Sequence, residues 1–505
     1  MSEENSAHKE PLIRYVNRRQ MSWRAVDIER LIDEEHLARA IWALVGRLDL
    51  SAFYAGIASS AVEGGRPAFD PQLLISLWVY AYSQGIGSAR EMARRCEYDP
   101  AFQWLTGLFE VNYHTLADFR VEKQQELDEL FTQVLATLSK EGLITLKQVM
   151  QDGTKMRALA SGQSFQHEET IREHLERAQQ HVQEMGDPRN EELSPRVREA
   201  RRRAREQQQQ RLEKALQELQ KLRQHKPSFA KKENKVSVTD PQARFMKQSD
   251  GGLAPSYNVQ ISTDAAQGMV VAVEVTTAAS DSAQLLPALE RIEQRLKQKP
   301  QQIVADGGYT THEVIKQMAE RQTDFLGNLG RDLKGSGRTA PHQLPPKAFL
   351  YDPETKRLRC PEGKWLGPQG RWYQESGTIY HRYEAKAEDC LPCPRKPQCC
   401  PNNQRRGRSV MHLEESSLVM AFRQKMASVE ARQQYRQRAR VAEFCHAWIK
   451  CKLGLRQFHV RGRIKARAEA LWACFTYNLQ QWIVCKKPQP RWPEHRELKH
   501  PKNRY

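Results

Sequence analysis

The sequence has no apolar run that approaches the roughly 18 residues a membrane-spanning helix needs. Its first residues, MSEENSAHKEPLIRY, are polar and partly acidic, so the apolar core of a secretory signal is also missing. Half of the ten cysteines are scattered along the chain, as is usual where thiols stay reduced. These absences exclude membrane and secreted classes, and we expect a soluble, cytoplasmic protein.

The charge is strongly positive and spread over the whole chain. Lys and Arg outnumber Asp and Glu by 79 to 61, which gives a net charge of +18. Such an excess favours a polyanionic partner, of which nucleic acid is the commonest. With 505 residues the chain is long enough for two to four domains.

Residues 1–140 have the pattern of short helices joined by tight glycine turns. Pro71 opens an amphipathic run that ends at Gly85, and Ser88 caps a short basic helix after it. Arginines on these helices, Arg120 among them, suit a helix-turn-helix type of DNA-binding bundle. A plain helical bundle with a solvated basic face fits the same pattern.

From residue 141 the residue pattern predicts strands mixed with helices. A β-rich run ends at Asp152-Gly153, and YNVQISTD and GMVVAVEVTT form a candidate antiparallel hairpin. An amphipathic helix over 282–297 and a strand ending at Asp306 follow. We therefore expect a mixed α/β sheet flanked by helices, contributed by residues 141–167, 225–326 and 409–485.

Two insertions and a tail complete the predicted organisation. Residues 168–224 are rich in Gln, Glu and Arg and predict a helical hairpin, which either touches DNA or a second subunit or is a solvated arm. Residues 327–408 are rich in Gly, Pro and Cys, and residues 486–505 form a proline-broken basic tail that we expect to be poorly ordered.

The stretch from Ala431 to Gln481 carries a polar stripe. Arg436, Glu443 and Lys450 are seven residues apart and so share one face of a helix. A carboxylate between two cations could serve a metal ion and a phosphate together, or it could be an ordinary surface ion pair.

Asp152, Asp306 and Glu443 together are a donor set suited to two-metal phosphoryl chemistry. Mg²⁺ is a hard ion that prefers oxygen ligands, and two such ions can activate an attacking oxygen and stabilise a leaving one. Each Asp-Gly pair taken alone could also be a simple turn.

With their flanks these residues resemble the DDE transposases of bacterial insertion sequences. The segments QDGTKMRALAS and IVADGGYTT are similar to the first and second aspartate segments of that family, and YRQRARVAEFCHAWIKCKLGL is similar to its glutamate helix. FDPQLLISLWVYAYSQG and HTLADFR resemble the helical N-terminal domain of the same proteins. The resemblance implies a ribonuclease-H-like catalytic domain, preceded by an all-helical domain and interrupted by the two insertions.

Site residues follow from the resemblance position by position. Asp152, Asp306 and Glu443 match the triad that binds Mg²⁺ or Mn²⁺, Lys450 the lysine that contacts phosphate, and Tyr435 the signature tyrosine. Three residues usually separate the signature arginine from the glutamate, whereas four separate Arg438 from Glu443. Because helical offsets of seven and three share the face of Glu443 and five does not, Arg436 and Arg440 are favoured over Arg438. Further expected DNA contacts are Arg461 and Arg120.

The implied activity is DNA transposition. The enzyme would bind the terminal inverted repeats of its element as a dimer, hydrolyse a phosphodiester, and let the freed 3'-hydroxyl attack target DNA. Two alternatives stay open: an inactive or domesticated DNA-binding protein, and a nuclease of the same fold without strand transfer.

Weaker signals lie in the cysteine cluster and in two further aspartates. Cys360, Cys390, Cys393 and Cys399 (or Cys400) include one CxxC pair and suggest either structural Zn²⁺ or free thiols. Asp240 and Asp281 also lie near strand ends. Either could support the site or even replace a member of the triad, but capping or turn roles are favoured.

Overall fold

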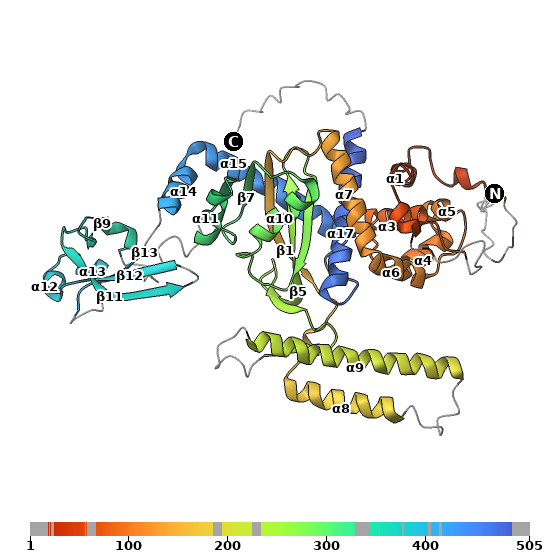
Figure 1. The fold of residues 1–505 in the computed structure, drawn as a ribbon, viewed down its shortest axis with the longest axis horizontal. Helices are drawn as coiled ribbons and strands as arrows, with labels where there is room; N and C mark the ends of the chain where they lie inside the picture. Colours follow the sequence, from red (N-terminus) through yellow and green to blue (C-terminus); the bar gives the residue numbers. More distant parts are fainter. Residues whose placement is uncertain are drawn as a thin grey trace, which may run out of the picture.

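The computed structural model describes residues 19, 21 and 25–486, except residues 56, 58–66, 185–193, 225–233, 329–343, 353, 376–377, 402–405 and 414–416. All but the first residue of the predicted basic tail therefore lies outside the described residues. Figure 1 shows an N-terminal helical part, a central sheet and a smaller β-rich part side by side, with a two-helix arm below. No helix in the described part of the chain is long and apolar enough to cross a lipid bilayer.

The N-terminal part consists of short helices, as the sequence predicts. Asp70 accepts a hydrogen bond from the backbone N–H of Gln72, and Ser88 caps the next helix in the same way. The run after Pro71 is buried on nearly all sides rather than amphipathic, because neighbouring helices surround it. The elements are η1 (Ile28–Leu31), α1 (Leu37–Val45), α2 (Ser51–Ala55), α3 (Pro71–Ser83), α4 (Ala89–Tyr98), α5 (Pro100–Thr106), α6 (Tyr113–Glu122) and α7 (Gln124–Lys140).

The central sheet is mixed, as predicted. Its strand order is β4-β5-β1-β7-β8, and β6 also pairs with β5. β1 is antiparallel to β5 and parallel to β7, which is parallel to β8. The hairpin predicted from the alternating apolar residues is formed by β5 and β6. The strands are β1 (Gln148–Arg157), β4 (Arg244–Lys247), β5 (Leu253–Asp264), β6 (Val270–Thr276), β7 (Gln302–Ala305) and β8 (Asp324–Gly327).

β1 is longer than predicted. The sequence places its end at Asp152-Gly153, but the strand continues to Arg157 because residues 153–157 still pair with β5. The parallel pairing with β7, by contrast, stops at Gln151 opposite Ala305. Asp152 therefore lies just beyond the pairing of β1 with β7, at a point where β1 is still paired with β5.

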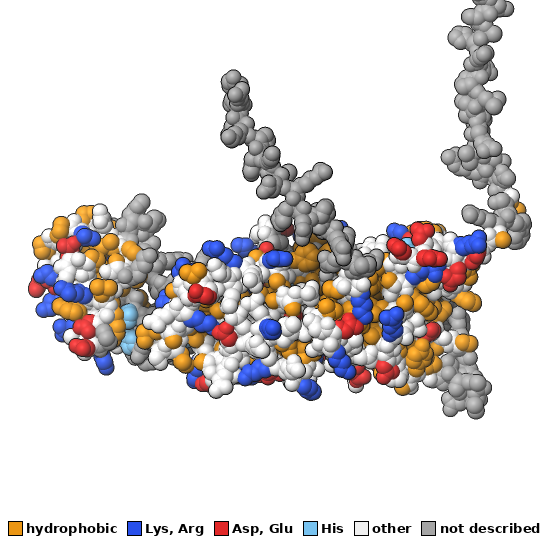
Figure 2. Space-filling view, turned by 90° about the horizontal axis from the view of Figure 1, so that it is seen from above, with side chains coloured by type: hydrophobic (Ala, Val, Ile, Leu, Met, Phe, Trp, Pro, Cys, Tyr) orange, Lys and Arg blue, Asp and Glu red, His pale blue; other side chains and the backbone are white. Residues whose placement is uncertain are grey.

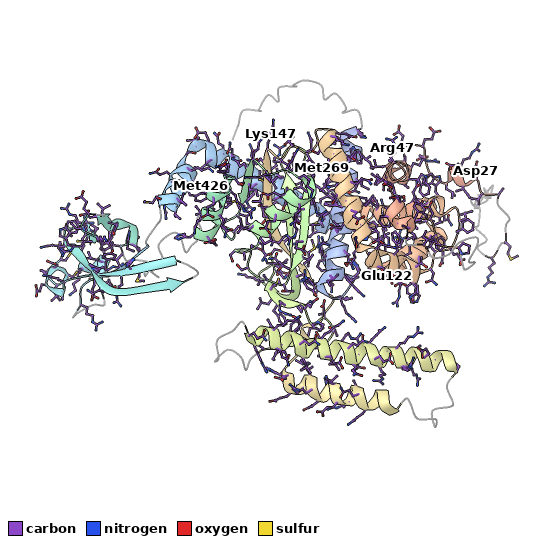
Figure 3. The ribbon with its side chains drawn as sticks, in the orientation of Figure 1. Asp27, Arg47, Glu122, Lys147, Met269 and Met426 are labelled. Atoms are coloured by element: carbon purple, nitrogen blue, oxygen red, sulfur yellow. The ribbon has the colours of Figure 1, made fainter. Side chains whose placement is uncertain are left out.

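Helix α17 (Arg463–Lys486) joins the sheet to the N-terminal helices. It packs against β6, α3 and α7, and one buried cluster runs through all of them. Asn478 donates to the backbone oxygen of Val270 and accepts from its N–H at 2.7 and 2.8 Å, so the amide pairs with a strand backbone inside the core. Met269, labelled in Figure 3, is completely buried in this cluster. Helices α10 (Leu285–Leu296) and α11 (His312–Glu320) follow β6 and β7.

The predicted helical hairpin is present as α8 (Glu168–Glu184) and α9 (Pro195–Gln224). Its helices share a small apolar cluster that includes Ile171, Leu212 and Leu219. β2 (Phe165–Gln166) and β3 (Val236–Ser237) pair at its base. Figure 1 shows the hairpin beneath the sheet, running roughly parallel to the long axis of the molecule.

The Cys-rich insertion folds around a second sheet of order β13-β12-β11-β10-β9. Phe349, Leu358, Leu366 and Tyr383 belong to its own buried cluster. The elements are η6 (Pro346–Ala348), β9 (Leu350–Asp352), β10 (Arg357–Arg359), β11 (Trp365–Glu375), β12 (Thr378–Ala385), α12 (Ala387–Cys390), α13 (Lys396–Cys399) and β13 (Ser409–Leu413).

The last helical part contains two π-helical turns. α14 (Ser417–Ala427) precedes α15 (Val429–Arg438), which passes into the π turn η7 (Ala439–Glu443), then α16 (Phe444–Ala447) and a second π turn η8 (Trp448–Lys452). The backbone stays helical from α15 to η8. Single π turns inside α-helices are rare and often occur at functional sites.

Candidate active site

Two aspartates stand side by side on neighbouring strands. Gln151 of β1 pairs with Ala305 of β7 in parallel register, so the next residues, Asp152 and Asp306, leave the pairing at the same edge of the sheet. Their charges interact, since Asp306 is among the causes that raise the pKa of Asp152.

Asp152 is largely buried and paired with an arginine. Its Oδ2 accepts a hydrogen bond from Nη1 of Arg438 at 3.1 Å. Burial raises the pKa of Asp152 to about 6; Arg438 opposes this rise and the charge of Asp306 adds to it. A proton therefore binds to this carboxyl more readily than to a free aspartic acid.

Arg438 is the last residue of α15 and faces the site, and a π turn follows it directly. Five residues span about 500° in an α-helix, which would put Arg438 and Glu443 on different faces. The π turn over 439–443 has more residues per turn, which reduces the angle between Arg438 and Glu443. Arg438 pairs with Asp152, whereas the side chain of Glu443 is exposed. Arg438 rather than Arg436 or Arg440 therefore contacts Asp152. Arg436 and Arg440 have exposed side chains, and their contact with DNA stays a prediction.

His446 is a site neighbour that the sequence reasoning missed. Its Nδ1 lies 3.8 Å from Oδ2 of Asp152. Burial, with Lys450 and Arg438 nearby, lowers the pKa of His446 to about 3, so the ring is neutral and the contact is not an ion pair. Its position one turn after Glu443 is the only signal that could have found it.

Lys450 points into the same region, whereas Glu443 is exposed. Nζ of Lys450 donates to the backbone oxygen of Lys155 on β1 at 3.2 Å. Burial lowers the pKa of Lys450, and the charge of Asp152 counteracts this. Glu443 has an exposed side chain, and its charge acts on Arg438.

The donor set suits Mg²⁺ in its chemistry, because carboxylate oxygens are the ligands that this ion prefers. Asp152 and Asp306 lie together, but Glu443 does not join them. Within the described residues, no three His, Cys, Asp or Glu side chains form a group that could hold a metal ion. Arg438 instead bonds the Asp152 oxygen.

Comparison with known proteins identifies the family. Residues 26–122 match the model described as transposase domain (DUF772), and residues 359–483 match the model described as transposase DDE domain. Both matches support a DDE transposase of an insertion sequence. The second match includes Glu443 and Lys450, and the first covers the helices from η1 to α6 of the transposase.

Other comparisons add little. A search of curated proteins finds no match to the transposase. One solved structure, described as the cryo-EM structure of a piggyBac transposase synaptic complex with hairpin DNA, aligns with 92% of this chain and 82% of its own. Its sequence is 9% identical and the TM-score is 0.23.

A third aspartate, Asp281, lies close to Asp152 and Gly153 in the transposase. It forms an ion pair with Lys155 at 3.2 Å and accepts hydrogen bonds from Asn258 and Gln260 at 2.5 and 2.7 Å. Its charge is also among the causes that raise the pKa of Asp152. Asp281 also opens a turn, since its backbone oxygen accepts the N–H of Gln284 at 2.9 Å, while its side chain bonds these strand residues. Asp240 is buried and bonds Tyr257 and the backbone of Gly462.

Gly153 is required by this packing. A Cβ built on it would lie 2.5 Å from Nε2 of Gln260 and 2.6 Å from Oδ1 of Asp281. The glycine after Asp152 thus admits the Asp281 side chain beside the strand rather than making a turn.

Tyr435 lies next to the site. The guanidinium of Arg438 is 5.9 Å from the centre of its ring, and burial raises the pKa of the hydroxyl. The charges of Asp306 and Asp152 also raise the pKa of this hydroxyl, while Arg438 lowers it.

The predicted DNA contacts differ in their positions. Arg461, like Arg436 and Arg440, has an exposed side chain. Arg120 does not: it is 4% exposed, donates to the backbone oxygen of Gly87 and pairs with the buried Glu469 at 3.4 Å. The prediction that Arg120 contacts DNA is therefore wrong, because its charge is used inside the core. Figure 2 shows Lys and Arg side chains spread along one face and mixed with Asp and Glu.

Four of the clustered cysteines lie close together. Burial raises the pKa of Cys399 to about 11, and its neighbours include Cys390, Cys393 and Cys400. Backbone N–H groups donate to the sulfur atoms of Cys360 and Cys390 at 3.3 and 3.4 Å. These thiols form no metal-binding group among the described residues, and zinc binding stays a prediction.

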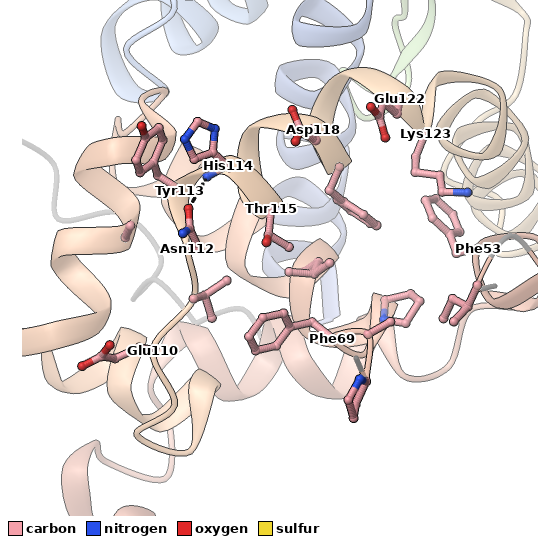
Figure 4. Close-up of a pocket in the computed structure, with 18 of the residues that line it drawn as sticks. Phe53, Phe69, Glu110, Asn112, Tyr113, His114, Thr115, Asp118, Glu122 and Lys123 are labelled. Carbon is pink, nitrogen blue, oxygen red and sulfur yellow. Dashed lines mark hydrogen bonds between the residues drawn. The ribbon is translucent and has the colours of Figure 1, made fainter. Parts of the chain in front are cut away.

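A separate cavity of about 730 Å³ lies in the helical part of the transposase. Figure 4 shows its wall from α6, with His114 and Asp118, and apolar side chains such as Phe53 and Phe69. None of the residues discussed at the sheet edge lines it.

Proposed function

We propose that the transposase binds the terminal inverted repeats of its element as a dimer and catalyses Mg²⁺-dependent DNA cleavage and strand transfer. The observation that carries this is the parallel register that puts Asp152 and Asp306 at one sheet edge, with Arg438 donating to Asp152. Paired carboxylates with a nearby guanidinium and ammonium suit a site for phosphoryl transfer.

We also propose a ribonuclease-H-like catalytic domain made of residues 141–167, 225–326 and 409–485. The order β6-β5-β1-β7-β8 supports it, with the first three strands antiparallel and the last two parallel to β1. In open sheets of this kind, ligands bind beyond the carboxyl ends of the parallel strands. Asp306 directly follows β7 at that end.

The residues of the site have distinct roles in this proposal. Asp152 and Asp306 would hold Mg²⁺, with the exposed Glu443 as the proposed third ligand. The ion would supply activation of the attacking oxygen and stabilisation of the leaving one. Arg438 balances the charge of the buried Asp152, and the half-buried Lys450 presents an ammonium that can hold a phosphate oxygen. His446 stays neutral and adds no charge beside them.

Single replacements test the triad. Asp152→Ala, Asp306→Ala and Glu443→Ala should each abolish Mg²⁺-dependent cleavage of element-end DNA while binding to that DNA remains. Asp250→Ala is the matched control, because this exposed turn aspartate carries the same charge away from the site. Undiminished cleavage by any of the three purified variants refutes the assignment of that residue.

A strand-transfer assay separates the transposase from a nuclease of the same fold. Pre-cleaved ends carrying a free 3'-hydroxyl should be joined to target DNA by the wild type. Cleavage without joining would favour the nuclease, and neither reaction would favour an inactive DNA-binding protein.

A further inference from the structure

A groove of about 640 Å³ separates the hairpin arm from the start of α17. One wall is α9, which contributes Arg211 and Lys214. The opposite wall is the loop before α17 and its first turn, which contribute Arg461 and Lys465. Figure 1 shows α9 lying just below the lower end of α17.

The groove carries uncompensated positive charge. Within the described part of the chain, Arg211, Lys214, Arg461 and Lys465 have no carboxylate partner. The acidic groups in the lining are already engaged: Glu218 pairs with Arg244 at 2.8 Å and with Lys221, and Asp240 accepts from Tyr257 and Gly462. Burial and the charge of Arg461 together lower the pKa of Arg211, which shows that like charges are held close.

The walls of the groove are fixed by contacts that do not involve these four cations. The Glu218–Arg244 ion pair ties α9 to strand β4. Asp240 accepts the N–H of Gly462 at 3.1 Å, and Gln242 accepts the N–H of Arg463 at 2.9 Å, so the loop after β3 caps the start of α17. The cations are thus positioned before any ligand arrives, which lowers the cost of binding one.

The face of α9 that lines the groove is a row of hydrogen-bond donors. Gln207, Gln210, Lys214 and Gln217 recur every three or four residues, which is the spacing of one helical face. From Gln207 to Lys221 this face is about 21 Å long at 1.5 Å per residue. That length matches about six base steps of duplex DNA at 3.4 Å each.

We propose that this groove binds the phosphate backbone of duplex DNA, so that the hairpin insertion acts as a sequence-independent clamp on the substrate. The proposal rests on the proposed function, since it takes DNA as the substrate. Amide, guanidinium and ammonium groups on a fixed concave surface bind phosphates without contacting the base edges that carry the sequence. The clamp adds a contact outside the Asp152–Asp306 edge and gives the insertion a function.

The salt dependence of DNA binding tests the clamp. The variant Arg211→Gln/Lys214→Gln removes two cations from α9, and Arg461→Gln/Lys465→Gln removes two from the opposite wall as an independent second variant. The control Arg172→Gln/Arg177→Gln removes two exposed cations from α8, in the same hairpin but outside the groove. Affinity of the full chain for a duplex of arbitrary sequence is measured by fluorescence anisotropy over a series of salt concentrations.

Each groove variant should lower the slope of log affinity against log salt by about 1.8, because each phosphate contact contributes about 0.9. Raising salt fourfold should therefore weaken a groove variant about twelvefold less than the wild type. The clamp is refuted if both groove variants keep the salt slope of the wild type. It is also refuted if the α8 control lowers the salt slope as much as the groove variants do.

The clamp and the catalytic proposal fail separately. If the wild type cleaves DNA but the groove variants keep its salt slope, only the clamp is wrong. If sedimentation shows that the groove variants lose self-association while their DNA slope is unchanged, the groove binds a second copy of the chain, and the clamp is likewise refuted.

Discussion

Replacing Arg438 by glutamine should slow DNA cleavage strongly, whereas the same change at Arg440 should not. Nη1 of Arg438 lies 3.1 Å from Oδ2 of Asp152, and the two side chains are only 17% and 14% exposed, so the contact is poorly screened by water. A hydrogen bond to a charged group contributes about 1.5–3 kcal/mol. If that contribution is lost from the transition state, the rate falls roughly ten- to 150-fold.

Single-turnover cleavage with enzyme in excess over DNA measures this loss without product release. Arg440→Gln is the matched control, because it removes the same charge from an exposed position in the π turn that follows Arg438. Its rate should stay within about threefold of the wild type, as expected for a surface site. A large loss at Arg440 with little effect at Arg438 would refute the assignment of Arg438 to the site.

Three further perturbations test particular contacts. Gly153→Ala should lower the free energy of unfolding, measured by urea titration, by about 1–3 kcal/mol through overpacking. Gly367→Ala is the control and should be neutral, because a Cβ at that position meets nothing within 4 Å. Equal effects of the two substitutions would contradict the packing described at Gly153. Folding raises the pKa of Asp152 from 3.8 to about 6, so between these pH values the folded chain binds a proton that the unfolded chain has released. The wild type should therefore lose stability relative to Asp152→Asn as the pH rises from 3.8 to about 6. The expected difference is on the order of 3 kcal/mol, at 1.36 kcal/mol per pKa unit, and parallel stability curves would refute the shift. Arg120→Met leaves the buried Glu469 with contacts to His459 but without its guanidinium partner, so it should cost about 1.5–3 kcal/mol of stability without changing the salt slope of DNA binding. An unchanged stability with a lower salt slope would restore Arg120 to the DNA interface.

Much of the sheet and its insertions could be predicted from local pattern. Alternating apolar residues identify the β5–β6 hairpin, and the apolar run before Asp306 identifies β7. The hairpin insertion follows from helical spacing of its leucines, with α8 ending before Gly186 and α9 beginning at Pro195. These features depend on neighbours in the sequence, which is why the pattern suffices.

The errors came from contacts between distant segments. The burial of Arg120 depends on Glu469, which lies 349 residues away, and no local pattern links them. Asp281 reaches the site only because β5 brings Asn258 and Gln260 beside β1. The π turn at 439–443 is a local feature, but the regular helical spacing assumed for this stretch could not reveal it.

The most direct test of the central claim is metal binding by the free protein, because it does not depend on DNA. Isothermal titration calorimetry with Mg²⁺ or Mn²⁺ should detect binding to the wild type and to the control Asp250→Asn. Asp152→Asn and Asp306→Asn should each weaken it by at least about tenfold, which is the lower range for disturbing a metal site. Equal affinity in the wild type and both variants would contradict the assignment of this sheet edge as the catalytic metal site.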